Sequence, residues 1–196
     1  MIPAGPADEH RAIAGGFHDV VRGVAADDWD AQSPVADWRA RDVVRHLVEW
    51  FPAFLADGSG LRIPPGPSVD DDPAGAWAHH AAAVQAVLDD PANADVTFAH
   101  PRLPASPLPQ AIAQFYTSDV FMHTWDLARA SGQEPALDEE RCRTMLTGME
   151  PLDEMLRHSG QYGARVAVAD DASWQDRLMG FVGRDPRWRA SVGGRS

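Results

Sequence analysis

Apolar residues recur every three or four positions along most of this chain, and this helical spacing is what most constrains its fold. The pattern is clearest at 108–131, where Tyr116, Val120 and Leu127 share one face and Gly132 follows as a C-terminal cap. Similar spacing predicts five further helices, at 7–28, 39–56, 73–90, 138–158 and 173–182. Pro52 and Pro151 fall inside two of these segments, where we expect a kink or an interruption.

The segments between the helices indicate the fold class. Two stretches rich in Pro, 58–73 and 91–107, predict long loops, and only 165–169 has the character of a strand. Helices joined in this way predict an all-α fold, namely an antiparallel four-helix bundle with a short irregular C-terminal extension. We expect residues 1–160 to form the bundle and 161–196 to pack on it, with a mobile tail after Trp188.

Charge and cysteine content exclude several classes of protein. The net charge of −12 argues against a nucleic-acid partner or an anionic membrane surface, since both bind basic patches. No segment reaches the roughly 18 consecutive apolar residues of a transmembrane helix, and residues 1–6 lack the features of a signal peptide. Cys142 is the single cysteine, so no internal disulfide can form and we expect a cytoplasmic location. All 17 basic residues are arginine, which excludes Schiff-base lysine chemistry.

Most of the eight histidines have ordinary structural explanations. We expect His10 and His18 at the surface, because polar residues surround them on their helix. His79 and His80 are adjacent on a predicted helix, so they point in different directions. His100 is in a predicted loop, and His158 is at the end of a predicted helix. None of these six is predicted to bind a metal.

His46 and His123 differ from the rest, because each lies beside the apolar face of a predicted helix. Asp119 precedes His123 by four residues, so the two side chains leave one face of the helix. Imidazole nitrogens and carboxylate oxygens both bind divalent metals, although such a pair can also be an ordinary surface contact. If His46 faces the same interior, three ligands would leave a position open for water or substrate, as a catalytic site requires.

Three further residues, Asp126, Trp38 and Trp50, each allow a functional and a structural interpretation, whereas Cys142 shows no sign of function. Asp126 could orient a ligand histidine, or it could have a structural role, pairing with Arg129 or capping a loop, and we favour the structural role. Trp38 and Trp50 could line a pocket, but core packing is the favoured interpretation. Nothing near Cys142 marks it as a nucleophile.

Several segments resemble a known family. Residues 38–47 follow the pattern W-x-x-R-D-x-x-x-H-L, and 119–130 place an acid four residues before a histidine. Residues 170–178 and 183–186 are similar to the C-terminal signature of an uncharacterised actinobacterial branch. Over about 7–188, the chain thus resembles the mycothiol-dependent maleylpyruvate isomerase N-terminal family of the DinB/YfiT-like superfamily.

The resemblance implies a metal-binding helical bundle with His46, Asp119 and His123 as ligands. Zinc is the expected ion, with nickel and manganese as alternatives. The resemblance also implies a low-molecular-weight thiol as cofactor, which in actinobacteria would be mycothiol. The metal would lower the pKa of the bound thiol, so that its thiolate can act as the nucleophile. Maleylpyruvate isomerase itself has a distinct C-terminal domain, whereas only a short segment follows the bundle here, so we do not expect that particular isomerisation. Asp119 is also one methylene shorter than the glutamate of some relatives.

Three functions remain as hypotheses. The first is a metal-dependent enzyme that activates a mycothiol-like thiol for S-transfer or isomerisation. The second is a metal-dependent hydrolase that uses metal-bound water as the nucleophile. The third is a non-catalytic bundle, with a vestigial metal site, that binds a small ligand or dimerises. A small molecule or thiol is the expected partner, and we expect a homodimer or a monomer.

Overall fold

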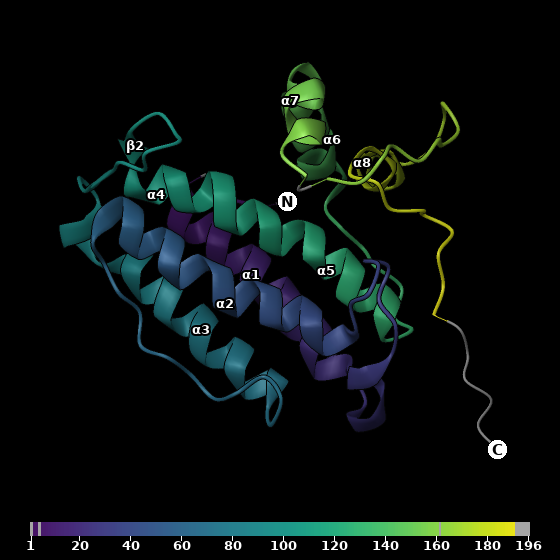
Figure 1. The fold of residues 1–196 in the computed structure, drawn as a ribbon, viewed down its shortest axis with the longest axis horizontal. Coiled ribbons are helices and arrows are strands. Elements are labelled where there is room, and N and C mark those ends of the chain that lie inside the picture. Colours follow the sequence, from purple (N-terminus) through teal and green to yellow (C-terminus); the bar gives the residue numbers. More distant parts are fainter. Residues whose placement is uncertain (1, 4, 161, 191–196) are drawn as a thin grey trace.

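The computed structural model describes residues 2–3, 5–160 and 162–190, and it is helical over most of their length (Figure 1). Its α-helices, in chain order, are α1 (Pro6–Gly23), α2 (Ala40–Ser59), α3 (Pro73–Asp89), α4 (Leu108–Ala111), α5 (Ser118–Ala130), α6 (Glu139–Met149), α7 (Asp153–His158) and α8 (Trp174–Phe181). Short 3-10 helices lie at Ala26–Asp30, Pro91–Asn93 and Glu150–Leu152. The all-α prediction is therefore confirmed.

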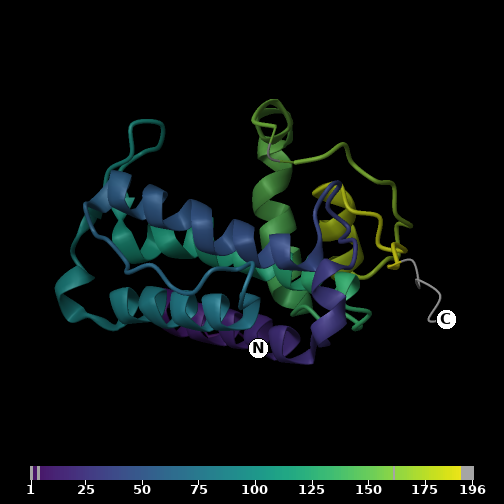
Figure 2. The ribbon, with the colours of Figure 1, turned by 60° about the horizontal axis from the view of Figure 1, so that its bottom comes forward.

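Four long helices form a bundle, as predicted, although two pairs of neighbours, α1 with α5 and α2 with α3, run parallel instead of antiparallel. Helix α1 packs on α3 and α5, and α2 packs on the same two helices from the other side (Figures 1 and 2). The loop 60–72 runs back along the bundle, so that α2 and α3 point in the same direction (Figure 1). Such a loop is long enough for this return, because an extended chain covers about twice the length per residue that a helix does.

Large aromatic side chains fill the space between these helices. Phe17 of α1 packs on Trp77 of α3, with ring centroids 4.4 Å apart, and both side chains are fully buried. Phe51 of α2 stacks on Tyr116 at 4.1 Å. Burying rings of this size removes much apolar surface from water and fixes the spacing of the helices.

The predicted 108–131 helix is continuous but not uniform. Helix α4 passes into a π-helical turn, Ile112–Thr117, and then into α5. The wider turn lets the Ser118 hydroxyl donate to the carbonyl of Ala113, five residues earlier. Wide turns of this kind occur often at functional sites, and here the turn directly precedes Asp119.

The last helices lie outside the four-helix bundle. Helices α6 and α7 form an arm, residues 139–158, that stands away from the bundle axis, and α8 packs against α6 (Figures 1 and 2). A 3-10 turn around Pro151 separates α6 from α7, as the proline predicted. The expectation of a mobile tail concerns mainly residues 191–196, which lie outside the described residues.

Some local predictions were wrong. The first helix ends at Gly23 rather than 28, and a separate 3-10 helix follows it. Pro52 does not shorten its helix, because α2 continues to Ser59. Residues 165–169 are not a strand: no neighbouring strand pairs with them among the described residues, although the Val166 amide donates to Gly180 O. The strands present are β1 (Thr97–Phe98) and β2 (Ser106–Pro107), an antiparallel pair of two residues each.

Candidate metal centre

Helix α2 presents His46 and Trp50 on one face, one turn apart. Arg39 is the N-cap residue of this helix, and its backbone amide donates to the Asp42 carboxylate over 2.9 Å. That contact satisfies an otherwise unpaired amide at the helix start and so fixes where α2 begins. The start of the helix in turn sets the direction in which His46 points.

Helix α5 presents Asp119 and His123, also one turn apart. The distance from His123 Nε2 to Asp119 Oδ1 is 3.4 Å. The other carboxylate oxygen, Oδ2, lies 3.0 Å from His46 Nε2 and accepts a hydrogen bond of 3.0 Å from Trp50 Nε1. Packing of α2 on α5 therefore brings His46 to the pair that the sequence had placed on one helix.

The three side chains have the geometry of a candidate metal site. One ligand atom from each of His46, Asp119 and His123 lies within 4.8 Å of the other two. Two imidazole nitrogens and a carboxylate oxygen fit a divalent first-row metal. The His123 side chain is 8 % exposed, whereas that of His46 is 31 % exposed, so the cluster is open on the His46 side.

Asp126 contacts His123 at Nδ1, the ring nitrogen that faces away from Asp119. Its Oδ2 lies 2.9 Å from His123 Nδ1, and the carboxylate is 2 % exposed. Arg184 binds both oxygens, with Nε to Oδ1 at 2.9 Å and Nη2 to Oδ2 at 3.1 Å. Arg129, which we had considered as a partner of Asp126, instead pairs with Glu134, so the predicted Asp126–Arg129 pair is absent.

Arg184 was not identified as a site residue from the sequence. It belongs to one of the motifs, 183–186, that carry the family resemblance, and this was the available signal. Its partner lies 58 positions away in the chain, and no local spacing predicts such a contact.

Two tryptophans flank the histidines instead of lying wholly in the core. The Trp38 ring stacks on His123 with centroids 5.7 Å apart and lies 5.0 Å from His46. Trp50 donates to Asp119 and packs beside His46 at 6.1 Å. Both are partly buried against the core, so they contribute to packing and to the wall of the site.

Charges in the cluster shift the pKa values of its members. Burial by itself raises the pKa of Asp119, but the facing His123 and His46 outweigh burial and lower it. Burial lowers the pKa of His123, but the carboxylates of Asp119 and Asp126 outweigh this and raise it. An ionised Asp119 is the state that binds a cation, whereas a proton on His123 competes with one.

Two tyrosines lie within the electrostatic influence of Asp119. Burial, and then the charge of Asp119, raises the pKa of Tyr116 well above 10.0. The same two causes, in the same order, raise the pKa of Tyr162, which comes from the segment after α7. Both phenols therefore keep their protons at neutral pH and can serve as hydrogen-bond donors.

The remaining histidines lie outside this cluster, and His10, which we expected at the surface, is not exposed. It is fully buried, and its Nδ1 lies 3.0 Å from the Thr117 hydroxyl. His80 is buried nearby, with its ring 5.5 Å from that of Tyr116. The polar neighbours of His10 in sequence lie on other faces of α1, which is why the sequence suggested exposure.

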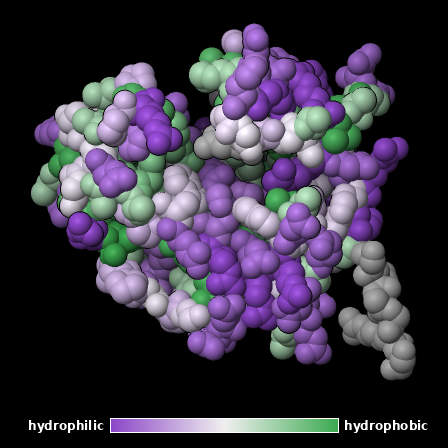
Figure 3. Space-filling model, viewed as in Figure 1, coloured by the Kyte–Doolittle hydropathy of each residue, from purple (hydrophilic) through white to green (hydrophobic). Residues whose placement is uncertain are grey.

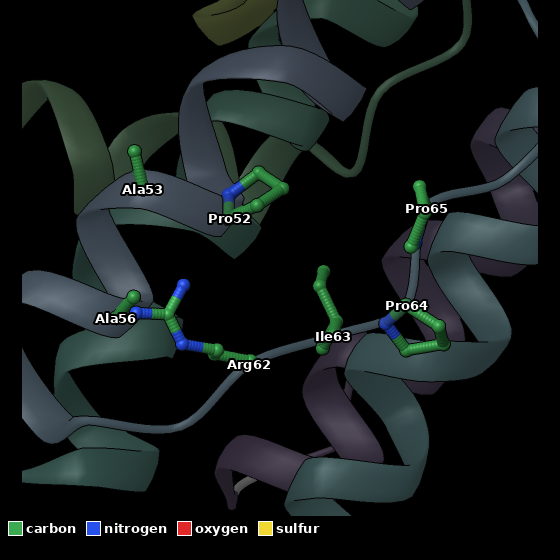
Figure 4. Close-up of a pocket in the computed structure, with 7 residues that line it drawn as sticks. All are labelled: Pro52, Ala53, Ala56, Arg62, Ile63, Pro64 and Pro65. Atoms are coloured by element: carbon green, nitrogen blue, oxygen red, sulfur yellow. The ribbon is translucent and has the colours of Figure 1, made fainter.

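The surface has hollows elsewhere too. Figure 3 shows the molecule hollowed between the α6–α7 arm and the end of the bundle that carries β2 and α4. A separate open hollow of about 620 Å³ lies between α2 and the loop after it (Figure 4). Its lining is Pro52, Ala53, Ala56, Arg62, Ile63, Pro64 and Pro65. This lining has no metal ligand or nucleophile, so the cluster on α2 and α5 is the better candidate for chemistry.

Comparisons with known proteins agree with the resemblance seen in the sequence. A family model described as "Mycothiol maleylpyruvate isomerase N-terminal domain" matches residues 10–128. Two uncharacterised proteins of Mycobacterium tuberculosis, from strains CDC 1551 and H37Rv, are each 28 % identical over 187 residues. These alignments cover 93 % of this chain and 99 % of each relative. No solved structure matches the chain. None of the described helices is long and apolar enough to cross a membrane.

Proposed function

The chain belongs to the mycothiol maleylpyruvate isomerase N-terminal domain family, and we propose that it is a divalent-metal-dependent enzyme that activates a low-molecular-weight thiol. The reaction would be an S-transfer or an isomerisation. The observation that carries the proposal is the convergence of His46, Asp119 and His123 in a cluster open on one side. Zinc is the preferred ion, with nickel and manganese as alternatives, because this donor set suits all three.

Each residue of the site has a definable task. His46 and His123 would hold the ion through Nε2, and Asp119 would hold it through a carboxylate oxygen. Trp50 keeps one oxygen of Asp119 in place by donating to it, and Asp126 keeps Nδ1 of His123 occupied so that Nε2 is the free ligand. A bound divalent ion would lower the pKa of a coordinated thiol and so supply the thiolate at neutral pH.

The surroundings suit a small organic thiol. Trp38 and Trp50 form an apolar wall beside the histidines, which would exclude water from one side of the bound thiol. Mycothiol is the thiol named in the description of the family, and we propose it, or a thiol of similar size, as the cofactor.

The first experiment is metal analysis of the purified protein and of a His123→Ala variant, with His158→Ala as the matched control. His158 is an exposed histidine on α7 that lies outside the cluster. We expect near-stoichiometric binding of zinc or cobalt to the wild type and the control, and loss of binding in His123→Ala. A wild type that binds none of zinc, nickel, manganese or cobalt would refute the metal site.

Cobalt-loaded protein then tests the thiol. We expect addition of mycothiol or a small thiol to produce a sulfur-to-cobalt charge-transfer band in the near ultraviolet. Turnover of an ester or amide without thiol, and no such band, would instead favour the hydrolase hypothesis. A loaded site that responds to neither thiol nor pH would favour the non-catalytic bundle.

A further inference from the structure

The C-terminal segment, residues 162–190, reaches the candidate metal centre through Arg184. The Arg184 guanidinium donates two hydrogen bonds to the Asp126 carboxylate. The pair is largely buried, since the Arg184 side chain is 17 % exposed and that of Asp126 is 2 % exposed. A bidentate pair of this kind fixes both partners in orientation as well as in distance. Asp126 lies within the part of the chain that matches the family model, whereas Arg184 lies far beyond its last matched residue, 128.

The backbone of the segment determines where Arg184 lies. Helix α8 ends before Gly183, whose φ of 91° is in the left-handed region, and the next amide, that of Arg184, donates to Met179 O over 2.8 Å. A side chain at Gly183 would meet the backbone of Gly163 at 2.8 Å, so the two glycines allow a close crossing of the segment on itself. Arg157 of α7 donates to the carbonyls of Gly163 and Phe181 and ties this crossing to the arm.

Asp126 connects Arg184 to the metal ligand. Its Oδ2 accepts from Arg184 Nη2 and faces His123 Nδ1 at 2.9 Å. A proton on Nδ1 that is donated to this oxygen leaves the Nε2 lone pair directed at Asp119 and His46. Without Arg184, Asp126 would be a buried carboxylate lacking its countercharge, free to turn away from His123.

We propose that docking of the C-terminal segment and occupancy of the metal centre are thermodynamically coupled through Arg184, Asp126 and His123. Arg184 is then a positioning residue that acts on the metal through Asp126. The inference rests on the metal site of the proposed function but not on its thiol chemistry. Coupling is reciprocal, so metal binding also stabilises the docked segment, by the same factor by which docking increases metal affinity.

Zinc affinity measures the first half of this coupling. It would be determined by competition with a chromophoric chelator for the wild type, Arg184→Gln, Arg184→Lys and the control Arg187→Gln. Arg187 is an exposed arginine of the same segment that pairs with Asp185, so its substitution removes the same charge without touching Asp126. We expect Arg184→Gln to weaken zinc binding about 10-fold or more, Arg184→Lys to weaken it less, and Arg187→Gln to leave it unchanged.

A double variant tests whether Arg184 acts through Asp126. Asp126→Asn alone removes the charge that Arg184 binds, so Arg184→Gln added to it should cost little further affinity. Equal losses from Arg184→Gln in both backgrounds would overturn the proposed route.

Hydrogen exchange measures the reciprocal half. Zinc should slow amide exchange across 162–190 in the wild type by a factor similar to the affinity loss, and should not do so in Arg184→Gln. If the wild type binds zinc and a folded Arg184→Gln binds it equally tightly, the coupling is refuted while the metal site stands. If the wild type binds no metal, the proposed function fails as well, so the two failures are distinguishable.

Discussion

His10 and His80 are buried in the bundle as neutral side chains, which makes the stability of this fold sensitive to acid. Burial, then the charge of Arg11, lowers the pKa of His10 from 6.5 to about 4. Burial, then His10 and His79, lowers that of His80 from 6.5 to about 4. The Nε2 atoms of both rings find no hydrogen-bond partner within the described part of the chain, so a proton there would have nothing to stabilise it.

The magnitude follows from the linkage between protonation and folding. The unfolded chain takes up a proton at each histidine near pH 6.5, whereas the folded chain resists protonation until about pH 4. The stability contributed by the neutral residue is therefore complete above pH 6.5 and is lost as the pH falls from 6.5 to 4. A difference of about 2.5 units corresponds to about 3 kcal/mol for each histidine, and the two contributions are not additive because the residues interact.

Substituting His80 by Phe removes one of these contributions while keeping an aromatic ring against Phe51 and Tyr116. The assay is urea unfolding at pH 7.5 and 4.5, followed by far-ultraviolet circular dichroism, for the wild type, His80→Phe and an exposed control, His158→Gln. We expect His80→Phe to lose about 2 to 3 kcal/mol less than the wild type between the two pH values. Equal losses in the wild type and His80→Phe would refute the reasoning, and the control should match the wild type.

Three further predictions follow from other parts of the structure. Asp119 and Asp126 outweigh burial and raise the pKa of His123, so zinc affinity should increase with pH until His123 is deprotonated. A zinc affinity that did not change between about pH 5 and 8 would contradict competition between protons and zinc at the site. The added methyl group of Gly58→Ala would overlap the Phe98 ring and should lower the free energy of unfolding by about 1 to 3 kcal/mol. The control Gly15→Ala, whose Cβ would meet no other atom, should raise the free energy of unfolding, and thermal unfolding of both variants measures the difference. Burial raises the pKa of Cys142 to about 12, so its thiol should react with a disulfide reagent only after denaturation, and rapid labelling of the native protein would show this wrong.

Features that depend on neighbours in the chain were accessible from the sequence. The period of apolar residues gave the long helices, because a helix buries one stripe of its surface whatever it packs against. The i, i+4 relation between Asp119 and His123 was likewise visible, since it needs only a helix at that position. The interruption at Pro151 followed from the missing amide of proline.

Very short or unusual elements leave too little signal in the sequence to be predicted from it. The strands of the β1–β2 pair have two residues each, and Phe98 of β1 lies against Gly58 of α2, a contact between residues 40 positions apart. The π-helical turn before Asp119 has no pattern of its own that separates it from an α-helix. Conversely, residues 165–169 suggested a strand, but a strand requires a neighbour to complete its hydrogen bonds.

Contacts between distant residues were decided by the tertiary structure. The sequence by itself determined that this chain forms helices and which face carries Asp119 and His123. Only the packing of α2 on α5 brought His46 to them, and only the docking of the C-terminal segment brought Arg184 to Asp126. The burial of His10 was decided in the same way, by helices that close around it. The physical reason is that local periodicity fixes the direction of a side chain on its own helix, whereas its partner is fixed by how whole helices pack.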